Sequence, residues 1–137
     1  MKLSMINLLN VEIRSAADIV TARQKGRVMA IELGFGGSDL TLIATAISEV
    51  ARNIVNHSAR GKVSLFEARQ GSKHGICVIA QDEGARPVST HRATQNGFSN
   101  HNGTGPDLNG SKWPMDNFEI HSKAGEGTTV TMKKWLD

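Results

Sequence analysis

The segment "ISEVARNIVNHS", residues 47–58, combines an apolar side with an unusual polar side. Ile47 and Ile54 lie two turns apart in a helical register, which predicts a helix that packs one face on a core. The other side of the same turns carries Glu49 and Asn53, where a solvated helix would ordinarily present lysines and glutamates. The helix therefore buries one face and offers a carboxylate and an amide on the other.

Two interpretations of this polar face are open. Glu49 and Asn53 are four residues apart, so they lie one turn apart on one face. Carboxylate and amide oxygens suit a Mg²⁺ ion held mainly by water and phosphates. A carboxylate near a transferring phosphoryl group can also orient or deprotonate an attacking hydroxyl. The ordinary alternative is a solvated helix face on which Arg52 is the salt-bridge partner of Glu49.

The remaining pattern predicts an α+β protein. The predicted elements are a strand (3–13), a helix from its N-cap Ser15 to Gly34, a helix capped by Ser38 or Asp39 that ends near His57, strands over 62–69 and 75–82, and two strands within 118–136. Grouped helices and grouped strands favour a two-layer α/β sandwich, with a mixed, largely antiparallel sheet that carries the helices on one face. We expect residues 1–137 to form one domain.

Composition argues against several function classes. The net charge is only +3 with dispersed basic residues, and the chain has no Tyr, four Phe and two Trp. A nucleic-acid-binding surface needs a denser basic patch or an aromatic platform. No apolar run reaches membrane-spanning length and no signal peptide is evident, so we expect no membrane partner and a cytoplasmic location. Cys77 is the single cysteine, which leaves no disulfide.

A long segment without regular pattern, residues 83–111, contains "NGTGPDLNG" at 102–110. Glycines there would let backbone N–H groups approach a phosphate closely. The segment is neither a Walker A motif nor a Rossmann fingerprint. A surface loop with no ligand is the alternative that glycine content alone leaves open.

Four segments that occur in a fixed order indicate a protein family more specifically than any one of the motifs above. They are "SEVARN", "IAQDEG", "GFSNHNGTGPDLNG" and "AGEGTTV". This order resembles the GHKL ATPase superfamily, which includes gyrase, histidine kinases and anti-sigma-factor serine kinases. Within it, the chain is most similar to the switch-protein serine kinase of the stressosome, the partner-switching module of the general stress response. The similarity extends from about residue 4 to residue 136 and implies the histidine-kinase-type ATPase fold.

The resemblance also implies roles for individual residues. Glu49 matches the family's general base, and Asn53 matches its Mg²⁺ ligand. Asp82 would accept a hydrogen bond from the adenine amino group of ATP, and Gly84 would allow close approach to the base. Thr128 would support the adenine side through Asp82 or a bridging water.

The phosphate side of the site would be an ATP lid over residues 95–111, built around Gly103 and Gly105. The family pattern is altered here, because Arg86 stands where a second glycine belongs and Asp107 replaces the third lid glycine. Arg86 either obstructs the nucleotide, points outward, or contacts phosphate as a fixed cation.

Two functions follow from the resemblance. The first is a serine/threonine protein kinase that uses ATP and Mg²⁺ to phosphorylate a STAS-domain antagonist or scaffold protein. The second is a degenerate kinase fold that STAS proteins sequester and that, once released, activates a serine phosphatase. The kinase is favoured by the intact Glu49, Asn53, Asp82 and Thr128. The binding module is favoured by Arg86, Pro106 and Asp107.

Overall fold

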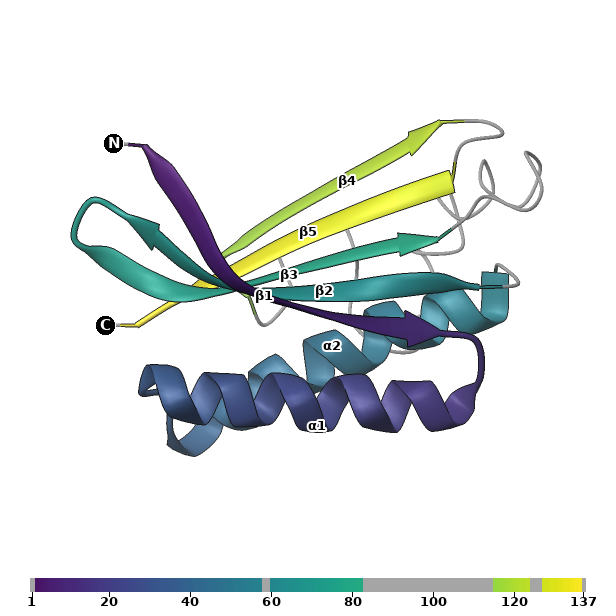
Figure 1. The fold of residues 1–137 in the computed structure, drawn as a ribbon, viewed down its shortest axis with the longest axis horizontal. Coiled ribbons are helices and arrows are strands. Elements are labelled where there is room, and N and C mark those ends of the chain that lie inside the picture. Colours follow the sequence, from purple (N-terminus) through teal and green to yellow (C-terminus); the bar gives the residue numbers. More distant parts are fainter. Residues whose placement is uncertain (1, 58–59, 83–114, 124–126, 137) are drawn as a thin grey trace.

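The computed structural model describes residues 2–57, 60–82, 115–123 and 127–136, with His57, Ser122 and Lys123 described by their backbone alone. Figure 1 shows helices on one face of a sheet, which confirms the predicted α+β sandwich. In chain order the elements are β1 (Leu3–Ile13), α1 (Ala16–Leu33), α2 (Gly37–His57), β2 (Gly61–Gln70), β3 (Lys73–Asp82), β4 (Asn117–Lys123) and β5 (Gly127–Trp135).

The sheet has five strands in the order β1-β2-β3-β5-β4. Every pairing between the described strands is antiparallel, in line with the predicted largely antiparallel sheet but without a parallel pair that would make it mixed. Figure 1 shows why β1 and β2 are antiparallel. Helices α1 and α2 run in opposite directions, so together they return the chain to the end of the sheet where β1 stopped. Strand β2 must then start there and run back along β1.

The ends of α1 follow the predicted signals. Asp18 accepts hydrogen bonds from the backbone N–H groups of Arg14 and Ser15, at 2.8 and 3.1 Å. The helix ends at Gly34, whose φ of 110° places it in the left-handed region. This conformation suits glycine because other residues would bring Cβ against the backbone.

The predicted start of α2 was slightly too late. The helix begins at Gly37, before the expected caps Ser38 and Asp39. The backbone N–H of Asp39 already donates to the carbonyl of Gly36 at 3.2 Å, so the first turn closes ahead of the expected cap. A difference of one or two residues is common at helix ends, because the terminal turns fray.

The core lies between the helices and the sheet. Ile43, Ile47 and Val50 of α2 are almost fully buried, as are Leu65 of β2 and Val78 of β3. Burial of such side chains supplies the main stabilising free energy of a small domain. None of the helices in the described residues is both long and apolar enough to cross a membrane.

Candidate functional site

The polar face of α2 is only partly exposed to solvent. Asn53 has an exposed fraction of 4%, and the Glu49 side chain is 25% exposed. Nη1 of Arg52 donates to Oε1 of Glu49 at 2.7 Å, so the ion pair expected of an ordinary helix face is present. The burial of Asn53 is not expected of such a face, since asparagine side chains are mostly exposed in folded proteins.

Asp82 and Thr128 meet at one end of the sheet. Asp82 is the last residue of β3 and Thr128 is the second residue of β5. Because these strands are antiparallel neighbours, the end of β3 lies beside the start of β5. The backbone N–H of Thr128 donates to Oδ1 of Asp82 at 3.0 Å, which fixes the carboxylate at the strand end.

Gly61 connects this strand end to α2. It pairs with Asp82 in the ladder between β2 and β3. A Cβ atom built on Gly61 would lie 2.2 Å from the carbonyl oxygen of Gln81 and 3.0 Å from Cγ2 of Ile54, the residue after Asn53. The helix therefore packs directly against the end of the sheet that carries Asp82. In Figure 1 the C-terminal end of α2, the end of β3 and the start of β5 lie on the same side of the molecule.

A hollow of about 310 Å³ opens beside Asp82 and is lined by Glu12, Gly61, Lys62 and Gln81 as well. Glu12, Lys62 and Gln81 belong to no motif that marks them as site residues in the sequence. These side chains come together only through the register, in which Glu12 lies opposite Lys62 and Lys62 opposite Gln81. Alternation along each strand could have placed them on one face, but not beside one another.

The phosphate side of the expected site lies outside the described residues. Gly84, Arg86, Gly103 and Gly105 fall there, as does the expected lid over 95–111. The described residues therefore include the expected adenine side of the site, at Asp82 and Thr128, and the helix α2 that carries Glu49 and Asn53.

The described donor set fits a weakly coordinated hard cation. Among the described residues, no group of three His, Cys, Asp or Glu side chains gathers in a way that could hold a metal. The expected ligand, Asn53, offers an amide oxygen. Mg²⁺ often takes only one or two protein ligands and completes its shell with waters and substrate phosphates.

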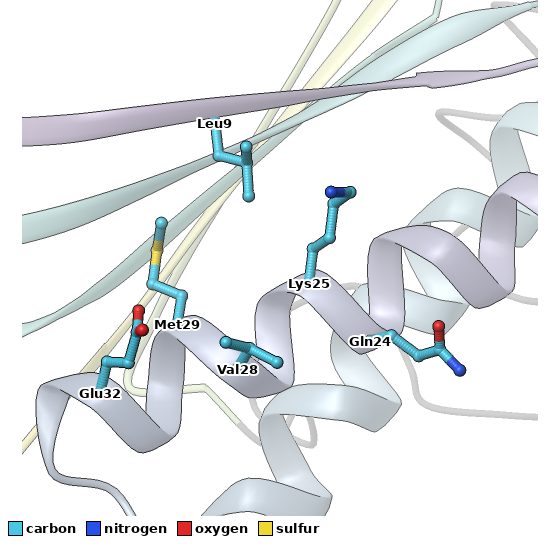
Figure 2. Close-up of a pocket in the computed structure, with 6 residues that line it drawn as sticks. All are labelled: Leu9, Gln24, Lys25, Val28, Met29 and Glu32. Atoms are coloured by element: carbon cyan, nitrogen blue, oxygen red, sulfur yellow. The ribbon is translucent and has the colours of Figure 1, made fainter.

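A second hollow, of about 300 Å³, lies between β1 and α1. Figure 2 shows Leu9 of β1 pointing toward Met29 and Lys25 of α1 across this space. None of the expected site residues lines it. The two hollows are separate features, and of the expected site residues that the structure describes, only Asp82 lines the one at the end of β3.

Comparison with known proteins gives one clear relationship. The chain is 43% identical over 126 residues to the serine/threonine-protein kinase RsbT of Bacillus subtilis (strain 168), and the match covers 92% of this chain and 95% of that kinase. No family model matches the chain. Identity at this level over nearly the full length of both chains establishes common family membership.

Proposed function

The chain belongs to the family of serine/threonine-protein kinase RsbT and is a serine/threonine-protein kinase, and we propose that it serves a partner-switching stress-signalling module. In this proposal it transfers the γ-phosphate of MgATP to a Ser or Thr of a STAS-domain antagonist in the cytoplasm. The same STAS proteins would sequester it, and a serine phosphatase regulator would be its second partner. Residues 1–137 would form one kinase domain with a lid over 95–111.

The observation that carries the proposal is the position of the polar face of α2. Ile54, next to Asn53, packs against Gly61, and Gly61 pairs with Asp82. Glu49 and Asn53 thus belong to the helix that supports the strand end where Thr128 holds Asp82. A nucleotide whose base lies at Asp82 could extend its phosphates toward this helix.

Asp82 supplies the proposed recognition of adenine. A carboxylate has two oxygens and about four acceptor positions, so Asp82 can accept a hydrogen bond from the adenine amino group as well as the one from the Thr128 N–H. Guanine carries a carbonyl oxygen at the corresponding position, and an oxygen facing a carboxylate is repulsive. The site would therefore prefer ATP to GTP.

Glu49 is the proposed general base. It would accept the proton of the acceptor hydroxyl while that oxygen forms a bond to the γ-phosphorus. The bond from the γ-phosphorus to the bridging oxygen would break, and ADP would leave with the electron pair. Asn53 would hold Mg²⁺, which supplies charge neutralisation for the phosphates when it is bound.

Phosphate transfer from [γ-³²P]ATP to a STAS-domain protein of the same organism tests the proposal. Glu49→Ala should reduce the rate of transfer by about 10²–10⁴-fold and change nucleotide affinity only a few-fold, because a base acts mainly on the transition state. Glu32→Ala, which removes an exposed carboxylate from α1, is the matched control and should transfer normally. Transfer by the Glu49 variant at the parent rate would contradict the assignment.

A further inference from the structure

We propose that Arg52 is a positioning residue for the kinase reaction, which holds Glu49 in the orientation that a general base needs. The inference rests on the proposed function, since it assumes that Glu49 takes the proton of the acceptor hydroxyl. Its structural basis is the hydrogen bond of 2.7 Å from Nη1 of Arg52 to Oε1 of Glu49.

The contact engages one oxygen of the carboxylate. Among the described residues, Oε1 of Glu49 accepts the bond from Arg52 and Oε2 accepts none. A carboxylate bound through one oxygen cannot turn freely, yet its second oxygen keeps its lone pairs. Oε2 is therefore the atom that would receive the proton, and the guanidinium fixes the direction in which it points.

The order of the side chains around α2 supports this role. At about 100° per residue, Arg52 lies about 60° to one side of Glu49 and Asn53 about 40° to the other. Asn53 is buried, whereas the Arg52 side chain is 48% exposed. Glu49 thus lies between the buried amide and an arginine at the solvent side, from which a protein substrate must approach. Restricting its rotamers there would favour a reactive geometry.

Two other interpretations give different results in the same assay. The pair could be an ordinary surface salt bridge, which contributes little to stability and nothing to transfer. Alternatively, the remaining N–H donors of Arg52 could contact the transferring phosphate directly. Arg52 would then act without Glu49.

The first measurement compares single variants in the [γ-³²P]ATP transfer assay with the STAS-domain protein. Arg52→Ala should lower kcat by roughly tenfold and leave the KM for ATP within about twofold, because a misplaced base costs rate and not ground-state binding. Arg52→Lys, which keeps a charged donor, should recover most of the loss. Arg27→Ala removes an exposed arginine of α1 and should have no effect. Thermal unfolding of each variant checks that the fold is retained.

The decisive comparison uses Glu49→Ala as a background. If Arg52 acts through Glu49, adding Arg52→Ala to Glu49→Ala should cause no further loss of transfer. A further tenfold loss in that background would show a direct contact with phosphate and overturn the inference. So would an unchanged kcat in the single Arg52→Ala variant. Normal transfer by Glu49→Ala alone would instead refute the proposed function.

Discussion

Asn53 has the most informative environment among the polar residues of α2. Its exposed fraction is 4%, although it shares a helix face with the partly exposed Glu49. Burying an amide costs free energy unless it keeps polar partners, so a purely solvated helix face would not place one there. The ion pair between Glu49 and Arg52 is compatible with either interpretation of the face, and the burial of Asn53 distinguishes this face from a fully solvated one.

Asp82 allows a direct test of the adenine side. Asp82→Asn should weaken ATP binding by roughly tenfold to a hundredfold, because the new amide can present a donor where the adenine amino group needs an acceptor. Isothermal titration calorimetry measures the change. Asp39→Asn removes a partly exposed carboxylate from the opposite end of α2 and is the control. Equal affinities of the Asp82 variant and the parent protein would contradict the assignment.

Glu67 of β2 is a buried carboxylate that is not one of the expected site residues. Its Oε2 meets Nε2 of His74 at 2.6 Å and Nη2 of Arg69 at 2.9 Å, and its Oε1 accepts from Nδ2 of Asn7 at 2.6 Å. The hydrogen bonds from His74 and then Arg69 lower the pKa of Glu67 below its ordinary value of 4.5, although burial opposes them. The cluster stabilises the ionised form.

Glu67→Gln should therefore destabilise the protein in a pH-dependent way. The folded-state pKa is lowered, so the stabilisation is complete above about pH 4.5 and is lost as the pH falls through the folded value. At pH 7 we expect a loss of about 1–3 kcal/mol in the free energy of unfolding, and a smaller difference from the parent below pH 4.5. Urea denaturation at several pH values measures it. Glu12→Gln is the exposed control, and a difference independent of pH would refute the argument.

At the scale of elements, β1 departs from a regular strand. The register between β1 and β2 shifts between Ile6 and Leu9, and Asn7 in this irregularity has a φ of 58°. Asparagine tolerates that region better than most residues, because its short side chain can bond locally. The bulge lets Asn7 reach Glu67 on β2. A bulge on an edge strand also hinders pairing with further strands.

The end of α1 gives an element-scale prediction with a closely matched control. Gly34→Ala should lower the free energy of unfolding by about 1–2 kcal/mol, because alanine at a φ of 110° is strained. Gly36→Ala, two residues later, has nothing within 4 Å of the added Cβ and no positive φ, so it should change stability by less than about 0.5 kcal/mol. Urea denaturation compares the two. Equal effects would mean that the left-handed cap is unimportant.

At the scale of the whole molecule, nucleotide binding should stabilise the fold. A ligand present at about 100 times its Kd stabilises by roughly 2.7 kcal/mol, which for a chain of this size raises Tm by roughly 10 °C. MgATP should therefore raise Tm, and MgGTP at the same concentration should raise it much less. Differential scanning fluorimetry measures both shifts. Equal shifts would show that Asp82 does not select adenine.

The sequence alone determined the local features of this protein. Ser15, Asp18 and Gly34 predicted the limits of α1, because caps depend on neighbouring backbone groups. Glu49 and Asn53 were placed on one face by helical spacing, and motif order indicated the kinase family. The roles expected of Gly84, Arg86, Gly103 and Gly105, which lie outside the described residues, stay predictions from the sequence.

The tertiary structure decided what local pattern could not. Only pairing of distant strands brings Thr128 to Asp82, 46 residues earlier, and only the folded chain buries Asn53. Likewise, the sequence identifies Glu67 only as a glutamate within a strand. The bulge in β1 places Nδ2 of Asn7, 60 residues away, 2.6 Å from Oε1 of Glu67. Dihedral preferences and periodicity act over a few residues, whereas register and burial arise from the simultaneous packing of elements far apart in the chain.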